Sequence, residues 1–253
     1  MQQSGQVSGD GYWLWNGAEW VPNPYRPAAY APWMHPYESA QFRATMVTVF
    51  IAANLIGVLL FIVFDGLDVI HVEQGSPKDT LFLAEGFVAL LALLAYYATF
   101  IPAVVFYCMW LHRVVRNMPS LGSIDPRWTP GGAVGRCFIP FLNLLHPVSS
   151  VLDAWRGSWP DQRWVDLGRR KSLRAPVLIV AWWAAWLGAR FVGWSGFGFQ
   201  QAEDVNSKLV GIAIDLASQV LLVTSALLAI LVVRRLTARQ ERKQELIASG
   251  QLA

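Results

Sequence analysis

The stretch "FIPFLNLLHP", residues 138–147, is apolar enough for a membrane, yet it contains two prolines, an asparagine and a histidine. If it crossed a bilayer, it would add one span to those elsewhere in the chain and would move the C-terminus to the other side. Pro140 and Pro147 would each remove a helical hydrogen bond that lipid cannot replace. The placement of this stretch therefore decides the topology of the whole chain.

The composition is that of a membrane protein. Of 253 residues, 55% are hydrophobic and 15% are charged, whereas soluble domains have about a quarter of their residues charged. Four windows have roughly the 20 apolar residues that a helix needs to cross a hydrocarbon core of about 30 Å; they are residues 44–64, 87–111, 176–197 and 210–233. The sequence predicts an all-α integral membrane protein whose first span serves as its own insertion signal, since no removable signal peptide precedes it.

Lysine and arginine are distributed unevenly over the segments between these spans. Ten lie within residues 112–175 and five follow residue 233, whereas the loop 65–86 has one against five acids. The positive-inside rule then places both termini and the central segment in the cytoplasm of a cell whose plasma membrane holds the spans. Because a fifth span would put one basic cluster outside, we predict that residues 133–155 stay on the cytoplasmic side. They form either a shallow re-entrant hairpin or an interfacial helix.

The four spans belong to a predicted membrane domain, residues 38–236. A Trp- and Pro-rich tail, residues 1–37, precedes it, and a basic tail, residues 237–253, follows it. Both tails are expected in the cytoplasm.

In the N-terminal tail, the dipeptide Asn16-Gly17 between aromatic runs predicts a β-hairpin over residues 12–21. A two-residue type I′ turn needs positive φ at both central positions, and it would pair Trp15 with Ala18. The expected result is one aromatic face, composed of Trp13, Trp15 and Trp20. This face is either a docking site for a proline-rich or extended protein partner or an anchor on lipid headgroups.

Polar residues inside the spans need partners. Arg190 and Asp215 lie at matching depth, about 9 Å below the outer surface at 1.5 Å per residue. An ionisable group in hydrocarbon is costly unless paired, so we predict an ion pair that also involves Gln219. The pair is either a site for an ion, a proton or an anionic headgroup, or a structural clamp. Asn54 is predicted to form an interhelical hydrogen bond.

The run from Trp110 to Trp155 contains a spaced pattern of aromatic, glycine, proline and asparagine residues. Its first part, Trp110, Arg113 and Asn117, forms one stripe on a helix, placed to grip the returning chain. The remaining members are Leu121, Gly122, Trp128, Pro130, Gly131, Ile139, Pro140, Asn143 and Pro147.

This pattern resembles the bacterial membrane-protein family of domain of unknown function 4328, and the resemblance implies membrane helices but no activity. Arg136-Cys137 departs from the aromatic or apolar residues expected there. Residues 9–22 resemble a short tryptophan-rich element found at the cytosolic N-terminus of bacterial membrane proteins.

No catalytic motif is present in the sequence, and its four histidines are scattered over different segments. Two cysteines cannot form a disulfide framework or a zinc cluster, so we expect no catalytic residues, no metal and no cofactor. Nucleic acid is not an expected partner, and a homo-oligomer stays open. The expected function is a non-enzymatic scaffold or adaptor that binds a partner or anionic lipid at its cytosolic face. The alternative is a small-solute or ion transporter that uses Arg190 and Asp215.

Overall fold

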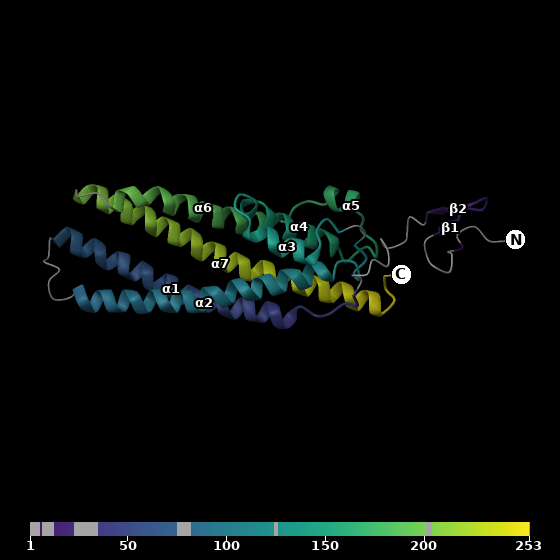
Figure 1. Ribbon diagram of the computed structural model, residues 1–253, viewed down its shortest axis with the longest axis horizontal. Helices are drawn as coiled ribbons and strands as arrows, with labels where there is room; N and C mark the ends of the chain where they lie inside the picture. Colours follow the sequence, from purple (N-terminus) through teal and green to yellow (C-terminus); the bar gives the residue numbers. More distant parts are fainter. Residues whose placement is uncertain are drawn as a thin grey trace.

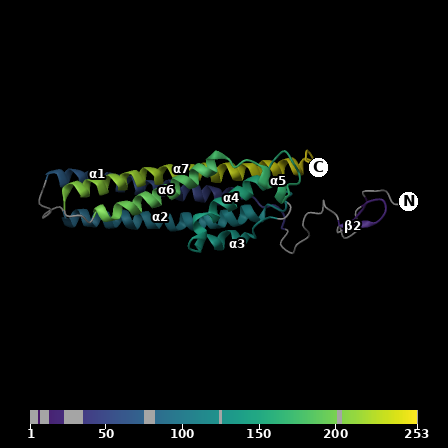
Figure 2. The ribbon, with the colours of Figure 1, turned by 90° about the horizontal axis from the view of Figure 1, so that it is seen from above.

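The structure, a computed structural model, describes residues 6, 13–22, 35–74, 82–123, 126–200 and 204–252. Four long helices run side by side along its longest axis (Figures 1 and 2): α1 (Gln41–Gln74), α2 (Phe82–Arg116), α6 (Val177–Gln200) and α7 (Val205–Ala248). In the described part of the chain, four helices are long and apolar enough to cross a membrane. The prediction of an all-α membrane protein with four spans is therefore confirmed.

The long helices form two hairpins, α1 with α2 and α6 with α7, and α1 also packs on α7. Glycines in α6 bring α7 close: a Cβ added at Gly196 would lie 2.9 Å from Ile214 Cγ2. Small residues of this kind allow the close backbone approach typical of membrane helix pairs. Across the other hairpin, Asn54 Nδ2 donates to the Tyr96 carbonyl and to Thr99 Oγ1, both at 3.0 Å. This is the interhelical hydrogen bond expected for Asn54.

Helix α7 is much longer than a membrane span. Its 44 residues extend about 66 Å at 1.5 Å per residue, roughly twice the thickness of a hydrocarbon core. Residues 234–248 therefore continue beyond the span 210–233 as helix, over much of the region predicted to be a basic tail. This extension is packed rather than free, since Leu236, Gln240 and Lys243 are buried.

Short helices gather around the α7 extension at one end of the bundle (Figures 1 and 2). They are α3 (Pro130–Gly135), the 3-10 turns η1 (Arg136–Phe138) and η2 (Leu142–Leu144), α4 (His146–Gly157) and α5 (Leu167–Ser172). We call these elements and the described segments that join them, with the last turns of α2 and residues 234–248 of α7, the cap. None of the elements described between α2 and α6 is long enough to cross a membrane, and Pro140 separates η1 from η2 as the sequence indicates.

The N-terminal hairpin is confirmed, but its predicted register is wrong. Strand β1 (Trp13–Trp15) pairs with β2 (Trp20–Pro22) so that Trp15 is opposite Trp20, not Ala18. The Asn16 side chain explains the difference: its Oδ1 accepts from the amides of Ala18 and Glu19, both at 2.8 Å, and so enlarges the loop to residues 16–19. Trp15 and Trp20 meet edge to face at 5.5 Å. The Trp13 side chain lies outside the described part of the chain.

Candidate functional site

The predicted stripe on α2 lies at the cap, where it holds two other segments. Trp110 Nε1 donates to Thr237 Oγ1 at 2.9 Å, and Asn117 Nδ2 donates to the Glu38 carbonyl at 2.8 Å. Arg113 forms an ion pair with the Glu38 side chain. The polar contacts of the stripe thus hold the α7 extension and the segment that enters α1, where the sequence predicts a contact with the returning chain.

Gln240 connects three elements inside the cap. Its Nε2 donates to the Val114 carbonyl at 3.0 Å and to Ser158 Oγ at 3.1 Å, and its Oε1 lies 3.4 Å from Asn117 Nδ2. Val114 is in the last turn of α2, where helical carbonyls have no partner within the helix. Gln240 therefore caps α2 from α7 and ties both to the end of α4.

The structure explains why glycine is the second residue of the Leu-Gly pair in the motif. Gly122 has φ of +83°, and a Cβ there would lie 1.8 Å from the Arg163 carbonyl oxygen. Its carbonyl accepts from the Val165 amide at 2.9 Å, so the two loops of the cap run in direct backbone contact. Only glycine combines this backbone conformation with this approach. Leu121 beside it is fully buried.

An ion pair fixes α5 to the cap. Arg170 Nε lies 3.2 Å from Asp153 Oδ1, and the same guanidinium contacts Ser123 Oγ. Burial raises the pKa of Asp153, while the charge of Arg170 opposes this rise. A buried pair of this kind is costly to break, because the remaining charge would have no partner.

Trp128 is the centre of a second group of motif residues. The guanidinium groups of Arg127 and Arg136 lie 4.7 and 4.3 Å from the centre of its ring, and the His146 ring meets its edge at 4.6 Å. Pro130 begins α3, and Pro147 is buried at the start of α4. Both prolines thus start helices, at the position where a missing amide proton costs least.

The stretch 138–145 exposes a continuous series of apolar side chains. Phe141 is 85% exposed and Leu145 is 70% exposed. The turn is held against α6, since Trp183 Nε1 donates to the Leu144 carbonyl at 2.7 Å. Within the turn, the backbone N–H of Asn143 donates to the Ile139 carbonyl at 3.0 Å. Pro140 and Asn143 thus shape the turn that connects α3 to α4.

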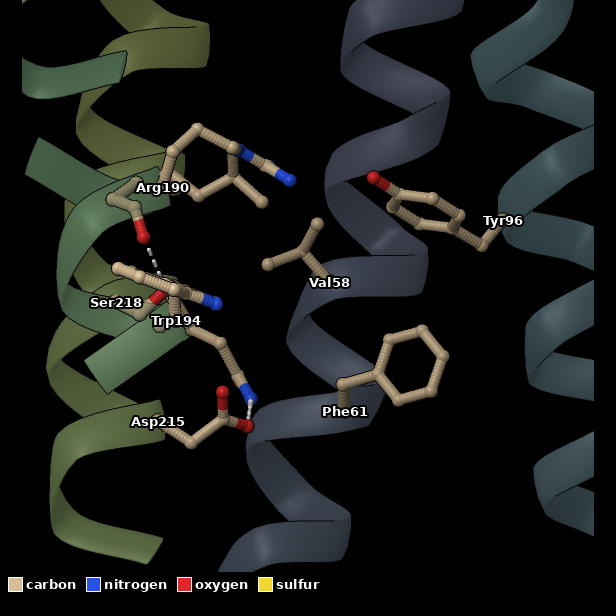
Figure 3. Close-up of a pocket in the computed structure, with 11 residues that line it drawn as sticks. Val58, Phe61, Tyr96, Arg190, Trp194, Asp215 and Ser218 are labelled. Atoms are coloured by element: carbon tan, nitrogen blue, oxygen red, sulfur yellow. Dashed lines mark hydrogen bonds between the residues drawn. The ribbon is translucent and has the colours of Figure 1, made fainter. Parts of the chain in front are cut away.

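The three residues of the predicted intramembrane ion-pair site line one cavity. It measures about 350 Å³ and is bordered by side chains of all four long helices, including Arg190, Asp215 and Gln219. Gln219 Nε2 donates to Asp215 Oδ2 at 2.8 Å, whereas Arg190 points across the cavity toward Tyr96 on α2 (Figure 3). Arg190 and Asp215 thus line the cavity from the same helix hairpin, α6 with α7, opposite Val58, Phe61 and Tyr96 (Figure 3).

Sequence reasoning missed the inner face of the α7 extension. Lys243 is fully buried, and its Nζ donates to the Gly157 carbonyl at 3.3 Å. Since Lys243 lies beyond residues 210–233, it is outside the membrane-spanning part of α7. Burial, followed by the charges of Arg163 and Arg239, lowers its pKa to about 7. The helical spacing of Val233, Leu236, Gln240 and Lys243 was the available signal, because it continues the buried face of the span.

The family comparison covers most of the residues described above. The family model described as Domain of unknown function (DUF4328) matches residues 73–238. No curated protein and no solved structure matches the chain. The matched region extends from the end of α1 to Thr237 and Ala238 on α7, and it includes the α2 stripe, the Trp128 group and the proline-broken turn. With more than half of its length matched, this membrane protein belongs to the family of domain of unknown function DUF4328.

Proposed function

We propose that this protein is a non-enzymatic membrane scaffold whose cap binds anionic lipid on the cytoplasmic side of the plasma membrane. The observation that carries the proposal is the apolar turn 138–145 beside two arginines stacked on Trp128. Apolar side chains that enter the acyl region, with basic groups at the level of the phosphates, are the combination by which proteins bind an anionic leaflet.

The depth of the turn supports this arrangement. Trp183, which binds the turn, is six residues after the start of α6 at Val177, or about 9 Å along the helix. The turn therefore lies beside the apolar ends of the spans, where lipid surrounds it. Arg127 and Arg136 lie on the Trp128 ring at the base of the turn.

The backbone of Phe141 gives a second reason. Its φ is +65° and its ψ is −44°, a sparsely populated backbone conformation that costs a residue with a Cβ about 1–3 kcal/mol. A ring that is 85% exposed would gain nothing in water. Transfer of a phenylalanine side chain to an apolar medium contributes about 1.5–3 kcal/mol, so insertion into lipid offsets the strain.

Lipid binding can be measured by native mass spectrometry of the detergent-solubilised protein with phosphatidylglycerol. The double variant Arg127→Gln, Arg136→Gln is expected to bind roughly tenfold or more weakly, since each surface cation contributes about 1 kcal/mol near an anionic leaflet. The matched control is Arg169→Gln, Lys171→Gln, which removes two exposed charges from α5. Equal loss in both double variants, or no loss in either, would refute the proposal.

A second candidate function is transport of a small ion through the bundle, and the cavity between the four long helices favours it. Arg190 on α6 and Asp215 on α7 give the cavity both charges, and each helix pair contributes to its lining. The test is chloride efflux and proton uptake by proteoliposomes. The variant Arg190→Gln, Asp215→Asn is expected to abolish flux, while Arg234→Gln at the end of the span leaves it unchanged. If the wild-type protein moves neither ion above the rate of empty liposomes, this candidate fails.

A further inference from the structure

Three basic side chains converge between the loop after α4 and the inner face of the α7 extension: Arg163, Arg239 and Lys243. We call them the basic cluster. Lys243 is fully buried, and the bond to the Gly157 carbonyl uses one of the three protons of its ammonium group. Arg163 and Arg239 are close enough to act on it electrostatically. Three like charges so close together are unfavourable, and either release of the Lys243 proton or a bound anion relieves the repulsion.

Aromatic rings hold the two arginines in place. The Arg239 guanidinium lies 4.7 Å from the Trp155 ring centre and 4.6 Å from that of Trp159, and the Arg163 guanidinium lies 4.4 Å from that of Trp164. Stacking of this kind occupies the faces of a guanidinium and leaves its N–H edges unused. Arg239 Nε and Nη2 and Arg163 Nη1 are indeed buried, with no hydrogen-bond partner among the described residues.

The nearby carboxylates do not neutralise the basic cluster. Asp161 acts on Arg239, but its side chain is exposed. Asp153 is paired with Arg170, and Glu241 accepts from Ser39 at 2.5 Å. The described surroundings of the basic cluster therefore leave a net positive charge with several unused donors.

We propose that the basic cluster binds a phosphate group. A tetrahedral dianion can accept from the N–H edges of two guanidinium groups at once, and its charge would neutralise the buried ammonium. The tryptophan rings around it exclude water, which strengthens such charge-assisted bonds. Arg163 and Arg239 are half-buried and so would form the mouth of the site, with Lys243 beneath them.

The position of the basic cluster favours a soluble phosphate over a lipid headgroup. Lys243 is ten residues after Val233, which places it about 15 Å beyond the end of the span along the helix. This inference rests on different residues from the lipid-binding proposal, at a different distance from the membrane, and each can fail without the other.

The experiment uses the full chain in an uncharged detergent. Its thermal unfolding midpoint and its titration heat are measured with sodium phosphate against sodium chloride of equal ionic strength. We expect phosphate to raise the midpoint and to give a saturable heat. Arg163→Gln should weaken binding roughly ten- to hundredfold, the range for lost hydrogen bonds to a charged group. The control Arg235→Gln, which removes an exposed arginine of α7, should bind as the wild type does.

A second variant keeps the test decisive if Arg163→Gln fails to fold. Lys243→Met removes the buried charge with little change of shape, so it should fold at least as well in chloride and lose its response to phosphate. A parallel measurement in phosphatidylcholine nanodiscs, with and without phosphatidylglycerol, separates the two sources of phosphate. The proposal is overturned if phosphate acts no differently from chloride, if Lys243→Met responds as the wild type does, or if only phosphatidylglycerol stabilises the protein.

Discussion

Gln240→Met should loosen the cap. In the wild type, Gln240 donates to the Val114 carbonyl and to Ser158 Oγ, and its side chain is fully buried. Methionine has a similar volume and flexibility, so the substitution removes the hydrogen bonds without creating a large void. The Val114 carbonyl at the end of α2 would then lose its partner.

The magnitude follows from the two groups that accept from Gln240, since Asn117 Nδ2, 3.4 Å from Gln240 Oε1, keeps its shorter bond to the Glu38 carbonyl at 2.8 Å. Each donated hydrogen bond contributes about 1 kcal/mol net, and a buried carbonyl left without a partner costs about 1–3 kcal/mol. Ser158 Oγ still donates to the Ala154 carbonyl at 2.7 Å, so its share is the smaller one. The total loss is about 2–4 kcal/mol, which corresponds to a fall of roughly 5–15 °C in the unfolding midpoint for a chain of this size.

The assay is thermal unfolding in detergent, followed by tryptophan fluorescence, because Trp155 and Trp159 of the cap report directly on it. Ser158→Ala should lower the midpoint by less than Gln240→Met, and Gln244→Met, one turn further along α7 and half-buried, serves as the control. A midpoint for Gln240→Met within about 2 °C of the wild type would show that the α7 extension does not support α2, and the account of the cap would be wrong.

Three further outcomes are expected. Burial, followed by the nearby Cys108, raises the pKa of Cys137 to about 11. In a Cys108→Ala background burial still raises this pKa, so alkylation of Cys137 by iodoacetamide at pH 8 should be much slower than that of a free thiol and should accelerate as the pH rises. Asn54→Leu removes two hydrogen bonds to α2 and should lower stability by about 0.5–1 kcal/mol in SDS-induced unfolding. An unchanged unfolding midpoint would show that these hydrogen bonds do not stabilise the bundle. A cysteine in place of Lys171, in a chain without its native cysteines, should resist a membrane-impermeant maleimide in intact cells and react after permeabilisation, and labelling of intact cells would reverse the proposed orientation.

The spans could be predicted from the sequence because apolar length alone determines them. The α2 stripe could also be predicted, since Trp110, Arg113 and Asn117 follow helical spacing. So could the turn at Pro140, because lipid cannot replace a lost hydrogen bond. These features depend on residues close together in the chain. Hydropathy, helical period and proline chemistry therefore suffice for them.

The contacts between distant segments could not be predicted in this way. The partner of Trp110 is Thr237, 127 residues away, and nothing local to either residue indicates the other. The predicted hairpin register was wrong because hydrogen bonds from the amides of Ala18 and Glu19 to the Asn16 side chain favour a longer loop than the tight turn typical of an Asn-Gly pair. The sequence predicts residues 237–253 as a basic cytosolic tail, yet three polar residues of this segment, Thr237, Gln240 and Lys243, are buried.

The proposed sites differ in how many of their residues lie within the range that the family model matches. The matched residues, 73–238, include Trp128, the apolar turn and Trp183, so every part of the lipid-binding arrangement lies within them. The intramembrane cavity needs Val58 and Phe61 from α1, and the basic cluster needs Arg239 and Lys243, all of which lie outside. If the matched region carries a common function, binding of the leaflet by the cap is the one that it can perform with its own residues. Ion transport and phosphate binding would then belong to this chain, through the helix before the matched region and the helical turns after it.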